Sequence, residues 1–346
     1  MASKRVSEKT AEQKLQALWA RGSDFLGCRH AILGGAMSWL SERNLVSAIS
    51  NAGGFGVIAC GSMTPDLLGP EIVATQGLTD KPFGVNLITM HPQLEELIDV
   101  CIDKDVSHVV LAGGLPAAAS IAKLKEAGIK VICFAPVLAI AKRLIKNGAD
   151  ALVIEGAEAG GHIGPVATSV LAQEILPHIT EVPVFIAGGI GRGEAIVSYL
   201  EMGAAGCQLG TLFVCATECV AHPNFKKAFI RANARDAVPT VQIDPKFPVI
   251  PVRALVNEGT KRFSEAQRTA AARVEKGEVE LKDAQLEIEH FWAGALKRAA
   301  IDGDVEGGSM MAGQSVGMVN AEQPTEMIIQ NLIDQAVRAL EARDDN

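Results

Sequence analysis

The chain has 346 residues, of which 48% are hydrophobic and 21% charged, and its formal net charge at pH 7 is −8. This length suits one large domain or two ordinary ones, and the apolar share is typical of a globular core. The negative charge argues against non-specific nucleic-acid binding, which needs a basic face. The longest apolar run, residues 131–141, contains a proline and is too short for a membrane span.

Residues 1–21 lack the apolar centre of a signal peptide and are too acidic for a transit peptide. Within them, residues 12–20 predict a short amphipathic helix on the surface. The seven scattered cysteines indicate buried thiols in a reducing compartment rather than disulfides. Cys215 and Cys219 have the spacing of a helical ligand pair, but no second pair accompanies them. We therefore expect a cytoplasmic protein without a metal centre.

Short apolar runs alternate with helical patterns along the first two thirds of the chain. The runs predict eight strands that begin at Ala31, Gly56, Gly84, Ser107, Lys130, Asp150, Val182 and Ala205. Amphipathic helices are predicted between them, and most end at glycine, which adopts the left-handed conformation easily. Eight repeats are typical of a (β/α)₈ TIM barrel. A doubly wound sheet also explains the alternation, but it has no need of eight repeats.

The composition and the pattern of the sequence change after residue 236. Residues 236–259 are proline-rich and extended, residues 260–300 are charged and helical, and glycines return in residues 302–317. We expect a barrel over residues 25–236 and a smaller helical and extended subdomain over residues 237–300. Residues 301–346 are then a glycine-rich segment and a closing helix that return to the barrel.

Glycine-rich loops follow several of the predicted strands, and ligands of such barrels bind at the carboxyl ends of strands. Gly188, Gly189, Gly210 and Thr211 follow the seventh and eighth strands, the common phosphate site of this fold. The alternative is a pair of tight turns without a ligand. The run "GGIGRGE" does not satisfy the dinucleotide pattern G-x-G-x-x-G, so a Rossmann interpretation fails locally.

His162 lies in the loop "EGAEAGGHIG" after the sixth strand, among glycines that let another group approach the backbone. An imidazole can take or give a proton near neutral pH, which suits a chemical or substrate-orienting role; a structural histidine that braces the loop is the alternative. Asn86 ends the third strand and offers a donor and an acceptor to a flat heterocycle, or else bonds the backbone. Glu158 orients the loop, binds a ligand or is simply solvated.

These motifs together resemble the flavin-dependent family that includes nitronate monooxygenases and enoyl-acyl carrier protein reductase II. The resemblance runs from about Ala31 to the C-terminal helix. Its matching pieces are residues 45–58, 79–87, 148–164, 182–195, 203–214 and 303–317. The form of the His162 loop, the glycine-rich segment and the charged helical insertion resemble the reductase branch more closely.

The resemblance implies a non-covalently bound FMN. The residues expected to contact it are Gly34, Gly35, Met37, Asn86, Glu155, Gly160, Gly161, Gly188, Gly189, Gln208, Gly210 and Thr211. It further implies that His162, Gly313 and Gln314 contact the substrate, with His162 as base in a monooxygenase or as a proton donor or binding group in a reductase.

The resulting functional hypothesis is an FMN-dependent oxidoreductase that reduces an enoyl thioester with NADH or NADPH. A nitronate monooxygenase that uses oxygen is the alternative within the family. The alternatives of other classes are a non-redox isomerase or lyase on the same phosphate site and a non-catalytic flavin sensor.

The expected partners are a small-molecule or acyl-thioester substrate and an acyl carrier protein. A homodimer is also compatible with the sequence. We expect the chain to bind neither nucleic acid nor membrane. Lys227, Arg231 and Arg235 recur at a spacing of four residues and are expected to align on one helix face. This basic stripe either docks an acidic carrier protein or the phosphates of coenzyme A, or is simply a solvated face.

Overall fold

The barrel dominates the computed structural model, which describes residues 9–344 apart from the side chains at positions 289, 293 and 344. All eight predicted strands form and pair in parallel, in the order β1-β9-β8-β6-β5-β4-β3-β2. A parallel bridge between Leu33 and Phe55 connects the two ends of this sheet, so the barrel is nearly closed. The predicted (β/α)₈ fold is therefore confirmed. The strands are β1 (Ile32–Gly34), β2 (Val57–Ala59), β3 (Gly84–Ile88), β4 (His108–Ala112), β5 (Lys130–Phe134), β6 (Ala151–Glu155), β8 (Val184–Ala187) and β9 (Gly206–Leu209).

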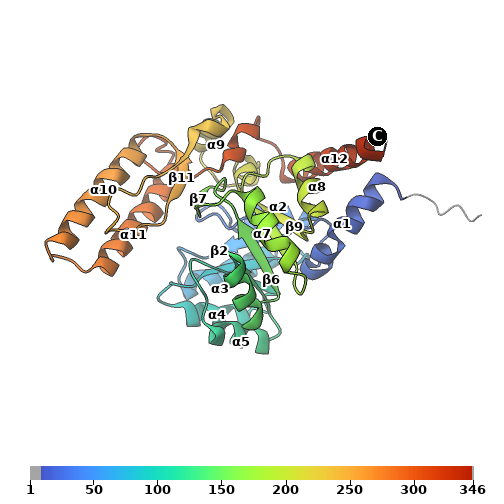
Figure 1. The fold of residues 1–346 in the computed structure, drawn as a ribbon, viewed down its shortest axis with the longest axis horizontal. Helices are drawn as coiled ribbons and strands as arrows, with labels where there is room; N and C mark the ends of the chain where they lie inside the picture. The colour runs from blue at the N-terminus through green and yellow to red at the C-terminus, as the bar shows by residue number, and fades with distance from the viewer. Residues whose placement is uncertain (1–8, 345–346) are drawn as a thin grey trace, which may run out of the picture.

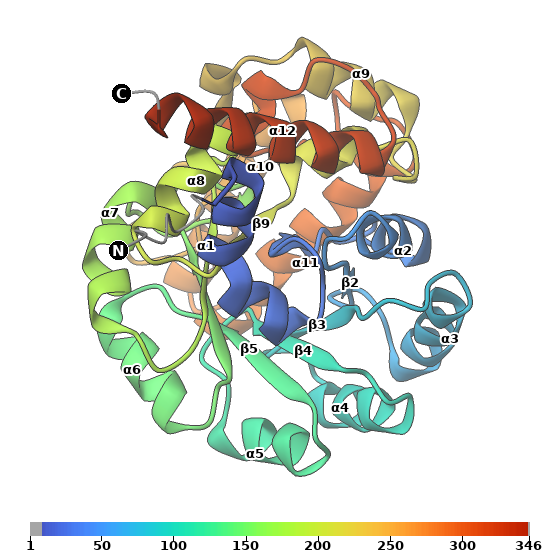
Figure 2. The same cartoon turned by 90° about the vertical axis from the view of Figure 1, so that its right-hand side faces the viewer.

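Helices surround the barrel, as Figure 2 shows. Those between consecutive barrel strands are α2 (Arg43–Asn51), α3 (Pro65–Gln76), α4 (Leu94–Asp103), α5 (Ala118–Glu126), α6 (Leu138–Lys146), α7 (Thr168–Ile175) with the 3₁₀ turn η1 (Leu176–His178), and α8 (Gly193–Glu201). Gly128, Gly148 and Gly203 follow three of them with φ of 78°, 104° and 104°, so the predicted glycine stops have the expected left-handed backbone. After β9 come the 3₁₀ turn η2 (Thr211–Cys215) and α9 (Pro223–Arg231).

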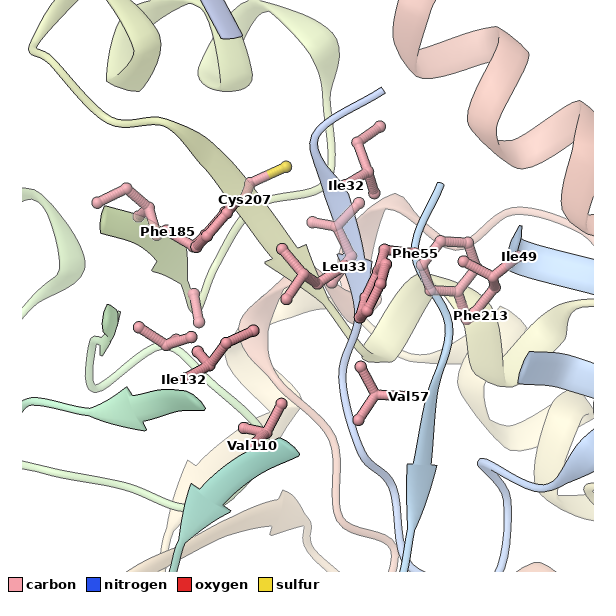
Figure 3. Close-up of a cluster of buried hydrophobic side chains, with 14 of the residues drawn as sticks. Ile32, Leu33, Ile49, Phe55, Val57, Val110, Ile132, Phe185, Cys207 and Phe213 are labelled. Atoms are coloured by element: carbon pink, nitrogen blue, oxygen red, sulfur yellow. The ribbon is translucent and has the colours of Figure 1, made fainter. Parts of the chain in front are cut away.

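The interior of the barrel is a packed core. Side chains from several strands meet there, among them Leu33, Phe55, Val110, Ile132 and Phe185, each at most 2% exposed (Figure 3). Because paired residues of neighbouring parallel strands point to the same face, this inner layer also defines which other side chains face inward.

Helix α1 (Ala11–Leu26) closes the amino-terminal end of the barrel. Trp19 is fully buried, the Arg21 guanidinium donates to the Thr180 carbonyl at 2.6 Å, and His108 Nε2 lies 3.0 Å from the Phe25 carbonyl oxygen. Figure 2 shows the helix lying across this end. The amphipathic helix was predicted, and its polar face is exposed. The sequence did not indicate that its apolar face covers the strand starts.

A second unit lies at the opposite end of the barrel (Figure 1). The antiparallel strands β10 (Ala237–Pro239), β11 (Val252–Leu255) and β7 (Gly161–His162) form a small sheet in this order. Helices α10 (Glu258–Glu275) and α11 (Leu281–Ala300) follow it in the chain. Around Phe247, Phe263 and Trp292 they build an apolar cluster separate from the barrel core.

The chain then returns to the barrel. The 3₁₀ turn η4 (Gln314–Met318) precedes the long helix α12 (Thr325–Asp344). Gln335 on this helix accepts a hydrogen bond from the Gly193 N–H at 2.9 Å, at the start of α8, and Arg343 pairs with Glu201 at the other end of α8. Among residues 9–344, no helix is long and apolar enough to cross a membrane.

Candidate active site

The loop after β8 has the geometry of an anion cradle. Gly188 and Gly189 have φ of 98° and 73°, and a Cβ at Gly188 would lie 2.9 Å from Thr168 Oγ1. Among the described residues, the N–H groups of Gly188, Gly189 and Ile190 have no hydrogen-bond acceptor. Since α8 begins shortly afterwards, its dipole adds to the positive potential. Partnerless N–H groups of this kind suit a phosphate.

A second set of free N–H groups follows β9. Thr211 and Leu212 open the 3₁₀ turn η2, and their N–H groups also lack an acceptor within the part of the chain that the structure describes. The Thr211 hydroxyl oxygen accepts from the Gly313 N–H at 3.0 Å, which leaves its own proton for an anionic ligand. The loops after β8 and β9 together therefore present N–H and O–H donors at the carboxyl ends of adjacent strands.

The loop after β1 meets the loop after β9. The Gly35 N–H donates to the Leu209 carbonyl at 2.7 Å, and a Cβ at Gly210 would lie 3.6 Å from Met37 Sδ. Met37 thus lies over Gly210. Gly34 packs closely on α2, because a Cβ there would lie 2.6 Å from Ile49 Cδ1.

The glycine-rich segment 302–317 lies against the loop that contains His162. The Gln314 N–H donates to the Glu158 carbonyl at 2.9 Å, and a Cβ at Gly160 would lie only 2.5 Å from the Gly313 nitrogen. A Cβ at Gly161 would lie 3.6 Å from Met311 Sδ. The expected substrate residues Gly313 and Gln314 are therefore beside the loop 155–164.

Glu155 and Gln208 belong to one inward-facing layer at the carboxyl ends of the strands. Glu155 pairs with Ala187, Ala187 with Gln208, and Gln208 with Leu33, which Figure 3 shows in the barrel interior. Burial raises the pKa of Glu155 from 4.5 to about 8. No hydrogen-bond or ionic partner of its carboxyl occurs among the described residues. A carboxyl of this kind is neutral near pH 7 and can donate a hydrogen bond to a ligand.

Asn86 faces the same interior from β3, since it pairs with Val110. It is 5% exposed, and its amide nitrogen donates to the Val110 carbonyl at 3.2 Å. The structural bond that was one of its two interpretations is thus present. Asn86 lies across the barrel from the β8 and β9 loops, so the structure does not bring it into direct contact with them.

His162 is on the short strand β7, paired with Val252 of β11, and its side chain is exposed. Pairing with a segment about ninety residues later was not predicted. The neighbouring pair is Gly161 with Arg253. The sheet therefore holds the histidine loop in place through β11.

Arg253 is the supporting residue that sequence reasoning missed. Its side chain is buried, with the guanidinium donating to the carbonyls of Ala157 at 2.8 Å and Ala237 at 2.6 Å. Burial lowers its pKa, while the charge of Glu158 raises it. A lone arginine in a proline-rich stretch carries no sequence signal for this role, because both acceptors are backbone carbonyls far away in the chain.

Glu158 orients the loop, which was one of its three interpretations. Its carboxylate accepts from both the N–H and the hydroxyl of Thr168, each at 2.8 Å, at the start of α7.

Cys215 and Cys219 are not on one helix, because η2 ends at Cys215. Within residues 9–344, no group of three or more His, Cys, Asp or Glu side chains is placed to hold a metal ion.

Comparisons with known proteins agree with this architecture. The family model for nitronate monooxygenase matches residues 20–103 and 93–335. FabK from Thermotoga maritima has a structure with a TM-score of 0.83 and 35% identity, covering 94% of this chain and 98% of that one. Nitroalkane oxidase from Streptomyces ansochromogenes has a TM-score of 0.78 and 27% identity, covering 93% of this chain and 99% of the other.

Curated relatives include enzymes with different substrates. The chain is 30% identical over 68% of its length to the nitronate monooxygenase of Paraburkholderia phytofirmans, of which 76% is covered. It is 29% identical over 92% of its length to (3aS,4S,5R,7aS)-5-hydroxy-7a-methyl-1-oxo-octahydro-1H-indene-4-carboxyl-CoA dehydrogenase of Mycobacterium tuberculosis, of which 96% is covered. The family match spans most of the chain, and the chain therefore belongs to the nitronate monooxygenase family of flavin-dependent oxidoreductases.

Proposed function

We propose that the protein binds FMN at the barrel mouth and reduces an enoyl thioester with NADH or NADPH. The observation that carries the flavin assignment is the pair of partnerless N–H sets at Gly188–Ile190 and Thr211–Leu212. They provide the donors that a phosphate dianion needs, at the place where barrels of this kind bind phosphate. Membership of an oxidoreductase family argues against the non-redox isomerase or lyase.

The chain's own residues account for cofactor binding. Gly188 to Ile190, with the Thr211 hydroxyl, would hold the phosphate, and Met37 over Gly210 would border the ring. Glu155 and Gln208, whose side chains face the barrel interior, would contact polar atoms of the cofactor from inside the barrel. When bound, FMN supplies hydride-transfer chemistry.

The same loops account for the handling of substrate and proton. Reduction of an enoyl thioester adds a hydride equivalent at the β-carbon and a proton at the α-carbon. His162 supplies this proton or orients the group that does, because an imidazole carries a transferable proton at neutral pH. Arg253 holds the loop in register through the carbonyl of Ala157. The segment around Gly313 lies against the loop and would cover the substrate.

The choice of a thioester rests on two similarities. Of the two solved structures described above, FabK, an enoyl-acyl carrier protein reductase II, has the higher identity and TM-score. A relative that covers 92% of the chain is named for a CoA thioester. The second candidate is a nitronate monooxygenase, which the family model and the Paraburkholderia relative favour. In that case His162 would act as the base toward a neutral nitroalkane.

A cofactor analysis followed by a paired assay tests the proposal. Purified protein should carry FMN by absorbance and mass spectrometry, or take it up on incubation. NADH or NADPH oxidation that depends on an enoyl thioester supports the reductase. Oxygen uptake with an alkyl nitronate and no nicotinamide supports the monooxygenase instead. Protein that neither contains nor binds flavin would refute both.

The role of His162 has its own test. His162→Ala should lower kcat by roughly 10²- to 10⁴-fold, the usual contribution of general acid–base catalysis, with FMN still bound. His178→Ala is the matched control, because His178 is exposed on η1, before β8 and away from the strand ends. Wild-type kinetics in His162→Ala would remove the imidazole from the mechanism.

A further inference from the structure

A cavity of about 390 Å³ lies beside the small sheet at the barrel mouth. Its walls come from the end of α9, from the 3₁₀ turn η3 (Ala234–Asp236), from β10, and from the end of β11 with the residue that follows. The lining residues are Ala228, Arg231, Ala232, Arg235, Asp236, Val238, Leu255 and Val256. The cavity is therefore apolar over much of its wall, with two arginines and one carboxylate at its border.

The arginines correct one expectation from the sequence. Helix α9 ends at Arg231, so Arg235 is on η3 and not on a continuous helix face with Lys227 and Arg231. The turn between them nevertheless brings Arg231 and Arg235 to one cavity, while Lys227 lies outside its lining. The predicted basic stripe is therefore not continuous: Arg231 and Arg235 line one cavity, and Lys227 lies apart from it.

Both guanidinium groups are available to a ligand. Arg231 and Arg235 are exposed, and within the described part of the chain Arg231 has no ion pair. Arg235 reaches only Asp236, at 3.8 Å and with 88% of its side chain exposed. Such an exposed contact contributes little and is easily replaced. Two exposed arginines at one cavity, of which only Arg235 has a weak ion pair, form a local anion-binding feature in a protein with a net charge of −8.

Strand β11 connects this cavity to the proposed active site. Leu255 lines the cavity, and Arg253, two residues earlier, pairs with Gly161 next to His162. At about 3.3 Å per strand residue, the two positions are roughly 7 Å apart along the strand. The glycine-rich segment also touches this region, because a Cβ at Gly317 would lie 2.7 Å from the Ala234 nitrogen. The four residues of β11 are buried, whereas Ala234 and Gly317 are exposed. A long, thin substrate would therefore reach from one place to the other over η3 and η4.

We propose that this cavity binds the phosphorylated adenosine of coenzyme A, and that the acyl-pantetheine arm runs past η3 and η4 toward His162. Planar guanidinium forks bind phosphate oxygens in pairs and also stack on purines. The aliphatic side chains of Val238, Leu255 and Val256 give the base an apolar surface. The volume falls in the usual range of small-molecule sites. This inference rests on the proposed thioester reaction.

Two observations favour coenzyme A over an acidic carrier protein at this position. The feature is a hollow with only two arginines, which suits the phosphates of one small ligand, whereas a carrier protein presents acidic side chains over a wide surface. A relative similar over 92% of the chain is named for a CoA thioester. The nucleotide end of coenzyme A is therefore the expected ligand of this cavity.

Substrate-dependent kinetics test the assignment. Arg231→Ala and Arg235→Ala should each raise KM for an enoyl-CoA about tenfold or more, the loss expected for one charge-assisted contact, with kcat unchanged. The same variants should match wild type with an enoyl N-acetylcysteamine thioester, which lacks the nucleotide. Lys227→Ala is the matched control, since it removes the same charge from α9 outside the cavity. Flavin content and thermal midpoint check that the variants fold.

A binding measurement separates this inference from the proposed reaction. Calorimetry with adenosine 3′,5′-bisphosphate should show one site on the wild-type flavoprotein and at least tenfold weaker binding to the Arg231→Ala/Arg235→Ala variant. If the bisphosphate binds in this way but no enoyl thioester is reduced, the proposed reaction fails and the nucleotide site stands.

Two results would overturn the nucleotide site even if enoyl thioesters are reduced. The first is absence of bisphosphate binding together with an unchanged KM for enoyl-CoA. The second is an effect of the arginine variants confined to thioesters carried by acyl carrier protein, which would make this surface a protein-docking face.

Discussion

Glu155→Gln should make the flavin-free protein more stable at alkaline pH. The folded protein keeps a proton on Glu155 up to about pH 8, whereas the unfolded chain releases it near the ordinary value of 4.5. Between these values the folded state binds more protons, so the free energy of unfolding of the wild type falls as pH rises. Glutamine carries no proton to lose, and the variant should lack this fall.

The magnitude follows from the size of the pKa rise. A rise from 4.5 to about 8 corresponds to roughly 5 kcal/mol at about 1.4 kcal/mol per pKa unit. The carboxyl is half-buried and keeps some contact with solvent, so we expect about half of that value, on the order of 2–3 kcal/mol. The difference between variant and wild type should be small near pH 5 and complete above about pH 8.

Urea unfolding of both proteins at about pH 5, 6.5 and 8.5 measures this difference as a change in midpoint at constant slope. Glu126→Gln is the control, because Glu126 is exposed at the end of α5 and its replacement removes the same charge. Parallel pH profiles for wild type and Glu155→Gln would refute the conclusion that this carboxyl is held neutral by burial. A control variant with the same gain at high pH would attribute the effect to net charge instead.

Three further substitutions test residues that bind the cofactor, support the His162 loop or stabilise the barrel. Gly188→Ala should weaken FMN binding at least tenfold, because an alanine must adopt a φ of 98° with its Cβ 2.9 Å from Thr168 Oγ1; unchanged affinity in a flavin titration would contradict the cradle. Arg253→Met should destabilise the protein by about 1–3 kcal/mol and lower kcat, since the Ala157 carbonyl loses its donor; a wild-type kcat would show that the loop needs no such support. Trp19→Ala should cost about 3–5 kcal/mol of stability, measured by urea unfolding, with the FMN dissociation constant unchanged. A loss of flavin affinity in the folded Trp19 variant would argue that α1 does more than close the far end.

Some features of the candidate site follow from local sequence. Gly188 and Gly189 adopt left-handed backbone directly after a strand, which the glycine pair itself indicates. Gly210 and Thr211 follow the next strand in the same way. These positions were predictable because a turn between a strand and a helix depends mainly on the residues within it.

Other features of the site depend on contacts that no local pattern encodes. The strand of His162 forms only because Val252, about ninety residues later, pairs with it. Arg253 supports the loop through two backbone carbonyls, and a carbonyl leaves no trace in side-chain identity. The pKa of Glu155 rises because the barrel buries it, and burial depends on the whole assembled fold.

By itself the sequence determined the eight strands, most of their helices and the glycine turns, because periodicity and glycine act within a few residues of one another. The tertiary structure decided what each surface meets. The amphipathic pattern of α1 predicted a helix, but only the assembled barrel offers its apolar face the strand starts to cover. In the same way, the end of α9 at Arg231 and the turn into η3 decide that two arginines share a cavity while Lys227 does not. Such outcomes depend on which distant segments pack together, and packing is a property of the whole chain.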